Sequence, residues 1–310
     1  MAFQTGDVIG PYTISKLLSN EGGMSQVFLA HDTERPSHMA ALKVQMTHEE
    51  KGAVFQDLLR QEAETLQHLR HPGVVRIYPL RIDNRVAYAA RAYDYNNQPW
   101  YYAMEYLSQG SNLSSVIKSI RKFPVEWIVE LFYQLLIVVE YVHLRGYAHG
   151  DLKPQNIFLR YPLAINETPF PILIDFGSAT TIKHGIRQLS ASIRYSPPEV
   201  ILALERQDIS PETLITQPEK IDVWALGAIL FEMVTGRPLI NRSNRREITT
   251  TILRDRLDTM RSLRPDIHPS LDKLASVMLR RNATERPDIT ELLQAVEERI
   301  HSVRPPRIRQ

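Results

Sequence analysis

The sequence predicts an α+β protein with a strand-rich N-terminal part and a larger, mainly helical C-terminal part. Residues 11–45 contain β-type segments separated by tight turns. Residues 51–70 and 125–145 place apolar side chains three and four positions apart, which is the periodicity of a helix with one buried face. At 310 residues, the chain is long enough to form two lobes or domains.

The composition excludes several classes of protein. The chain has no cysteine, so disulfides, thiol catalysis and thiolate metal sites are excluded. A formal net charge of +2 gives no reason to expect a nucleic-acid partner. The longest apolar stretches, residues 128–142 and 223–234, are interrupted by glutamates, and the first residues are polar. We therefore expect no membrane span, no signal peptide and a cytoplasmic location.

Residues 19–30 read S-N-E-G-G-M-S-Q-V-F-L-A, a glycine-containing turn between two predicted strands. Gly22 and Gly23 would let backbone N–H groups approach phosphate oxygens, since they have no Cβ in the way. Asn20 also tolerates a positive φ better than most residues. The pattern fits a phosphate-binding loop, and it fits an ordinary β-hairpin turn equally well.

Lys43 and Glu62 are two charged residues at apolar positions. Lys43 lies within the apolar segment A-A-L-K-V, and Glu62 lies on the apolar face of the predicted helix at residues 51–70. An unpaired buried carboxylate is very costly, so we expect Lys43 to be its partner. The alternatives are an outward-pointing Lys43 and a Glu62 on the surface.

The rest of the N-terminal part reads as strands and connections. Pro72 ends the helix, and residues 74–78 form a strand. Residues 81–99 are interpreted as a somewhat long connection, followed by a last strand at residues 101–107. In the C-terminal part, a short helix is expected from residue 110. The helix at residues 125–145 is expected to bury an apolar face that includes Trp127.

Five further motifs follow in the C-terminal part. Residues 149–156 read H-G-D-L-K-P-Q-N, and residues 172–177 read I-L-I-D-F-G, a buried strand ending at an aspartate. The others are S-I-R-Y-S-P-P-E at 192–199, D-V-W-A-L-G at 222–227 and E-R-P at 285–287. In this order and over about residues 11–300, the motifs resemble those of the bacterial-type (Hanks-type) serine/threonine protein kinases.

This resemblance implies a bilobal protein-kinase-like fold with ATP bound between the lobes. The small N-lobe, residues 1–106, would be an antiparallel β-sheet with one helix that binds nucleotide. The mainly α-helical C-lobe, residues 107–302, would carry catalysis and bind the substrate. Residues 303–310 are basic and proline-containing. They predict a disordered tail, or a linker toward a further domain or a membrane anchor.

The resemblance also implies a role for each charged residue of the motifs. Asp151 would deprotonate the acceptor hydroxyl, and Lys153 would offset charge on the transferring phosphoryl group. Asn156 and Asp175 would hold Mg²⁺, with Mn²⁺ as an alternative ion. ATP would be bound through Lys43, held by Glu62, and through Asn20, Gly22, Gly23, Val27, Ala41, Glu105, Leu107 and Phe158.

Three functions remain open on these residues. An active protein kinase acting on Ser or Thr is favoured, because every charged catalytic position is filled and Lys153 is typical of that acceptor class. The altered glycine loop and Gly150, which stands where arginine is usual, would also fit an ATP-binding pseudokinase that serves as a scaffold. The H-G-D triplet occurs in small-molecule kinases as well, but Asp222 and Arg286 are typical of protein kinases. The expected partner is a protein substrate, and a dimer is left open.

Gly150 leads to a prediction about regulation. In most of the family the missing arginine binds a phosphate on the activation loop, the segment that follows Asp175. We therefore predict that phosphate on this loop is not the main activating signal. The candidate acceptors are Thr180, Thr181, Ser190 and Ser192, and the basic residues that could replace the missing anchor are Lys183, Arg187 and Arg194.

Overall fold

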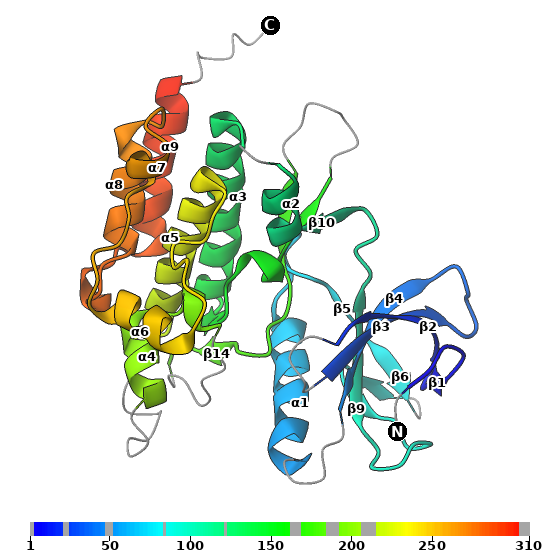
Figure 1. The fold of residues 1–310 in the computed structure, drawn as a ribbon. Coiled ribbons are helices and arrows are strands. Elements are labelled where there is room, and N and C mark those ends of the chain that lie inside the picture. Colours follow the sequence, from blue (N-terminus) through cyan, green and yellow to red (C-terminus); the bar gives the residue numbers. More distant parts are fainter. Residues whose placement is uncertain are drawn as a thin grey trace, which may run out of the picture. The chain divides into compact units, whose positions relative to one another are not determined.

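The computed structural model describes residues 3–20, 25–46, 52–82, 85–120, 123–161, 169–183, 192–205 and 215–303 (Figure 1). The chain divides into two compact units, Met1–Ser108 and Gln109–Gln310. The first contains an antiparallel sheet and one described helix, and the second is mainly helical. The predicted α+β class, with a small sheet unit and a larger helical unit, is confirmed.

The first unit is built around one antiparallel sheet. Its strands follow the order β1 (Val8–Ile9), β2 (Tyr12–Ser19), β3 (Ser25–Asp32), β4 (Met39–Gln45), β9 (Trp100–Glu105) and β5 (Ile77–Tyr78), and β8 (Ala90–Arg91) also pairs with β9. Side chains alternate between the two faces along each strand. Leu42 and Val44 of β4 are fully buried in a hydrophobic cluster on one face. Lys43, which lies between them, therefore faces the other side.

Helix α1 (Gly52–His68) corresponds to the helix predicted at residues 51–70. It packs on the sheet face that carries Lys43, because Lys43 binds Glu62 of this helix. Leu59, Ala63 and Leu66 of the same helix are buried. Its apolar periodicity therefore predicted the buried face correctly.

The hydrophobic cluster on the other face uses residues that the sequence interpretation treated as a connection. Residues 80–91 form β6 (Leu80–Ile82), β7 (Arg85–Ala87) and β8, where only a linking segment was expected. Leu80, Ala90 and Ala92 are buried in the cluster, and Tyr95 packs against it. The prediction was wrong because these apolar positions are separated by arginines and tyrosines, which hide the strand pattern. The strand expected at residues 74–78 is also shorter, since β5 contains only Ile77–Tyr78.

The second unit is organised around a buried helix. Its helices are α2 (Leu113–Ser119), α3 (Val125–Leu144), α4 (Pro198–Glu205), α5 (Glu219–Thr235), α6 (Arg245–Leu253), α7 (Met260–Leu263), α8 (Pro269–Met278) and α9 (Ile289–Val303). Helix α5 packs against α3 and α8, and α3 packs against α9. Every residue from Lys220 to Val234 in α5 is buried. A helix that is buried all round in this way can anchor the loops that surround it.

Two expectations for the start of this unit need correction. Gly110–Asn112 form strand β10, and helix α2 begins only at Leu113 because the Asn112 side chain caps it by accepting from the N–H of Ser115. Trp127 is half-buried rather than buried, since the inward face of α3 passes through Ile128 and Leu131 instead.

Short strands hold the segment that contains the predicted catalytic residues. Strand β11 (Tyr147–Ala148) pairs with β14 (Thr180–Thr181), and β12 (Ile157–Arg160) pairs with both β10 and β13 (Phe170–Leu173). Residues 149–156 therefore lie between β11 and β12, each of which is held by pairing with another strand. Asp175 lies shortly after the end of β13. None of the helices in the described part of the chain is long and apolar enough to cross a membrane. Residues 304–310, most of the predicted tail, lie outside the described residues.

Candidate active site

The loop at residues 149–156 is fastened to helix α5 by Asp222. This carboxylate is fully buried, and it accepts hydrogen bonds from the backbone N–H groups of His149 (2.8 Å) and Gly150 (2.9 Å). The Nε2 atom of His143 lies 2.9 Å from the same carboxylate. A buried charge needs such donors, and these donors fix the start of the loop. Asp222 does not cap the start of α5, because this helix begins at Glu219.

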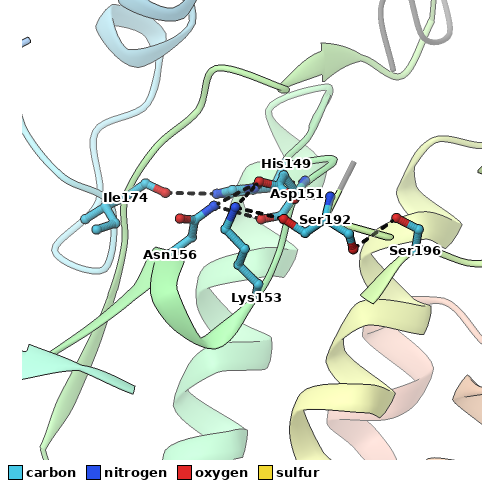
Figure 2. A network of polar contacts seen from close by, with 7 residues as sticks. All are labelled: His149, Asp151, Lys153, Asn156, Ile174, Ser192 and Ser196. Carbon is cyan, nitrogen blue, oxygen red and sulfur yellow. Dashed lines mark hydrogen bonds and ion pairs between the residues drawn. The ribbon is translucent and has the colours of Figure 1, made fainter. Parts of the chain in front are cut away.

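Asp151 is the centre of a polar network (Figure 2). Lys153 Nζ donates to Asp151 Oδ2 (2.7 Å) and to Ser192 Oγ (2.9 Å). The backbone N–H of Ser192 donates to Asp151 Oδ1 (3.3 Å). Asn156 Nδ2 donates to the Asp151 backbone oxygen (2.9 Å) and to Oδ2 (3.3 Å). Donors on both carboxylate oxygens hold Asp151 in one orientation, which is what a base for a hydroxyl group requires.

Asn156 and Asp175 are brought together through the backbone. The N–H of Ile174, the residue before Asp175, donates to the backbone oxygen of Asn156 (3.0 Å). Asp175 has a φ of +62°, a conformation that is uncommon for a residue with a side chain and that often marks a functional site. The centroid of the His149 ring lies 4.7 Å from that of the Phe176 ring, and this contact joins the loop at residues 149–156 to the turn at Asp175.

The side chains of these two residues suit a hard divalent cation such as Mg²⁺, which prefers oxygen ligands. The amide nitrogen of Asn156 is used by Asp151, so its Oδ1 atom is the group left to accept a cation. Among the described residues, no group of three His, Asp or Glu side chains could hold a metal ion.

The first unit holds the predicted Lys43–Glu62 pair. Lys43 Nζ donates to both carboxylate oxygens of Glu62, each at 2.8 Å. The Glu62 side chain is only 2% exposed and that of Lys43 is 11% exposed. The alternatives of an outward Lys43 and a surface Glu62 were therefore wrong. Val27 lies directly opposite Lys43 on β3, and Ala41 is two residues before it, so all three share one face of the sheet.

The remaining predicted nucleotide contacts are placed as follows. Asn20 is exposed after β2, while Gly22 and Gly23 lie outside the described residues. Glu105 ends β9, and Leu107 follows it and is half-buried. Phe158 lies opposite Ile172 on β12. Since Phe158 belongs to the second unit, its joint contact with an adenine ring that also touches the first unit stays a prediction.

The sequence interpretation missed the pairing of Tyr195 with Glu232. The Tyr195 hydroxyl donates to Glu232 Oε2 (2.7 Å), which joins the segment after Ser192 to helix α5. Burial raises the pKa of Glu232, although the Tyr195 hydroxyl and the charges of Arg194 and Lys118 oppose the rise. Burial also raises the pKa of Tyr195. A glutamate that interrupts the apolar stretch at residues 223–234 was the one available signal.

Arg286, one of the residues that the resemblance singles out, pairs with Glu199. Arg286 Nη1 and Nη2 donate to Glu199 Oε1 (2.6 Å) and Oε2 (2.8 Å), so the two side chains form a two-point ion pair. Arg286 also donates to the backbone oxygens of Lys220, Arg280 and Arg281. This pair fixes the end of the segment that starts at Ser192 onto the helical unit.

Comparison with known proteins supports the resemblance to protein kinases over most of the chain. The family model of the protein kinase domain matches residues 14–296. The serine/threonine-protein kinase PknD of Chlamydia trachomatis serovar D is 27% identical over 92% of this chain and 31% of its own length. Sperm motility kinase Z of Mus musculus is 27% identical over 94% of this chain and 51% of its own length. The serine/threonine-protein kinase PknD of Mycobacterium tuberculosis is 26% identical over 91% of this chain and 38% of its own length. The chain thus spans between about a third and a half of the length of these relatives.

Proposed function

The chain belongs to the protein kinase domain family, and from this premise we propose that it transfers the γ-phosphoryl group of ATP to serine or threonine hydroxyls of proteins. The observation that carries the proposal is the convergence of Lys153, Asn156 and Ser192 on the carboxylate of Asp151. Two observations support serine or threonine as the acceptor. Lys153 is typical of kinases with this acceptor, and two of the relatives are named serine/threonine-protein kinases.

In the proposed reaction, Asp151 receives the proton of the acceptor hydroxyl. The acceptor oxygen forms a bond to the γ-phosphorus, and the bond from that phosphorus to the β–γ bridging oxygen breaks, leaving ADP. Lys153, 2.7 Å from Asp151, offsets negative charge on the group in transfer. Phosphoryl transfer asks mainly for positioning and charge stabilisation, and this cluster supplies both.

The nucleotide would be oriented from the first unit. Lys43, held by both oxygens of Glu62, would pair with the α- and β-phosphates. Asn156 and Asp175 would hold Mg²⁺, which neutralises phosphate charge when it is bound. Val27, Ala41, Glu105, Leu107 and Phe158 remain the proposed contacts of the adenine ring, with Asn20, Gly22 and Gly23 near the phosphates.

The test uses two nearly isosteric variants and two matched controls. Asp151→Asn and Lys43→Met should each lower kcat/KM by at least about a hundredfold, because base catalysis alone contributes about 10²–10⁴. The controls Asp94→Asn and Lys16→Met change exposed residues and should retain wild-type turnover. Incubation of each protein with Mg·ATP and a generic protein substrate, followed by mass spectrometry, reports transfer, acceptor type and autophosphorylation together.

Wild-type transfer by either active-site variant would contradict the assignment of roles. ATP binding by the wild-type protein without any turnover would instead favour the scaffold function. Transfer to a small alcohol but not to protein would favour a small-molecule kinase. Treatment with a phosphatase before the assay would test the regulatory prediction, which expects most activity to survive.

A further inference from the structure

Four arginines lie in or next to the segment that begins at Ser192. Arg194 is part of a short 3₁₀ helix, Ile193–Tyr195, and its Nη2 atom donates to the backbone oxygen of Arg242 (2.9 Å). Helix α6 packs against this 3₁₀ helix and presents Arg245 and Arg246 in its first turn. Arg242, Arg245 and Arg246 are exposed, and Arg194 is half-buried. These four residues are called the arginine patch below.

The positive charge of the patch is largely uncompensated. Within the described part of the chain, none of its guanidinium groups forms an ion pair with a carboxylate. Two acidic groups close to the patch are Glu247, which is exposed in the first turn of α6, and Glu232, which interacts with the charge of Arg194. Glu232 is 8% exposed, already accepts the Tyr195 hydroxyl, and also feels the charge of Lys118. It therefore does not offer an open anionic surface to a basic ligand.

The segment that contains Arg194 also contacts the proposed catalytic carboxylate, through Ser192. The N–H of Ser192 donates to Asp151 Oδ1 (3.3 Å), and its hydroxyl accepts from Lys153 (2.9 Å). Arg194 follows two residues later, about 4 Å further along a 3₁₀ helix that rises about 2 Å per residue. A bound peptide advances about 3.3 Å per residue. Arg194 is therefore within reach of side chains a few positions from the acceptor, and the other three arginines lie where α6 and the residues before it pack on the same 3₁₀ helix.

We propose that the arginine patch selects protein substrates that carry acidic side chains close to the acceptor serine or threonine. This inference rests on the proposed kinase activity and names its substrate class. Guanidinium groups bind carboxylate and phosphate groups through two parallel hydrogen bonds, which lysine cannot do. The positive end of helix α6 adds to the attraction, and the same charges repel basic peptides.

The test compares peptides that share one acceptor serine and differ in the flanking residues. The flanks carry Glu, Gln, Lys or phosphoserine, so that size is nearly constant between Glu and Gln while charge changes. Wild-type kcat/KM should fall in the order phosphoserine, Glu, Gln, Lys, with up to about a fivefold effect for each exposed ion pair. The preference should shrink between roughly 50 and 500 mM NaCl, because exposed charges are screened.

A charge-reversal variant tests whether the arginine patch causes the preference for acidic peptides. Arg245→Glu combined with Arg246→Glu should abolish the preference for the Glu peptide over the Gln peptide and improve the relative rate on the Lys peptide. The control is Arg256→Glu with Arg261→Glu, which changes the same net charge at exposed arginines beyond the C-terminal end of α6. The control should keep the wild-type ratio. Because the readout is a ratio between peptides, a general loss of activity does not imitate the result.

Two results would overturn the inference alone. One is wild-type transfer with no acidic preference or with a basic one, and the other is an equal change of the ratio in both double variants. If the wild-type protein transfers phosphate to none of the peptides, the proposed function fails, and the inference fails with it.

Discussion

Gly150 places an unusual backbone conformation directly before the proposed base. Its φ is +77°, and its N–H donates to Asp222. A Cβ atom at this position would lie 2.6 Å from the backbone oxygen of Ser178, which is too close for any real contact. The residue before Asp151 is therefore limited both by its dihedral angle and by the segment that follows Asp175. An arginine here would require the Ser178 backbone to move.

We expect Gly150→Ala to be more harmful than Gly146→Ala. Gly146 also has a positive φ, +83°, but an added Cβ would meet nothing within 4 Å. Both variants should lose roughly 1–2 kcal/mol of unfolding free energy from the dihedral strain. Gly150→Ala should lose about 1–3 kcal/mol more from the steric overlap. Urea unfolding measures this difference, and equal losses would show that the neighbouring loop yields without cost.

Glu232 gives the unfolding free energy a pH dependence. Burial raises the pKa of Glu232 in the folded protein above the usual value of 4.5, which applies to the unfolded chain. Between the unfolded and the folded pKa, the folded protein therefore binds more protons than the unfolded chain. Its contribution to stability is fully present below pH 4.5 and is lost as the pH rises through the folded pKa. Glu232→Gln should therefore become more stable relative to wild type as the pH rises from about 4 to 8. Urea unfolding across this range, with the exposed Glu247→Gln as control, should show the trend only for Glu232.

At the scale of elements, helix α5 holds the active-site loop by one side chain. Asp222→Ala would leave the N–H groups of His149 and Gly150 without their acceptor in a buried place, at a cost of about 1–3 kcal/mol for each group. Asp272→Ala is the matched control, because Asp272 also accepts from two backbone N–H groups, those of Met260 and Arg261.

The two variants should separate stability from activity. Both should lower the unfolding free energy, but only Asp222→Ala should lower kcat and speed amide hydrogen exchange at residues 149–150. A normal kcat for a folded Asp222→Ala protein would mean that the short strands alone position the loop.

The elements differ in how far the sequence predicted them. Helices α1 and α3 have long periodic faces, and their bounds were predicted to within a few residues. The hairpin of β6 and β7 was missed, because three-residue strands are too short to show a period. The pairing of Lys43 with Glu62 was predicted because each charge stood at an apolar position. Glu232 also stood within an apolar stretch, but Tyr195 did not mark itself as its partner, since a contact between residues far apart in the sequence needs the fold itself.

At the scale of the whole molecule, the proposed activity is divided between two units. The Lys43–Glu62 pair belongs to the first, and the cluster around Asp151 belongs to the second. Each unit fixes its own charged groups by contacts within itself, such as the ties from Asp222 and from Arg286 to Glu199. The sequence motifs predicted these residues because each motif is local. The joint site they would form is not local, so it remains part of the proposal.

The hydrophobic cluster on the sheet face opposite Lys43 determines where the chain can be shortened for protein production. Phe3 stacks edge-on against Phe28 and Tyr95 with ring centroids 6.0 and 5.0 Å apart, and Ile9 is completely buried. The part that matches the family begins only at residue 14, and α9 continues to Val303, past the matched end at residue 296. A fragment cut at the matched limits would lose Phe3 and Ile9 and expose the apolar residues that they pack against, which favours aggregation. Expression boundaries should therefore follow the packed residues and not the limits of homology.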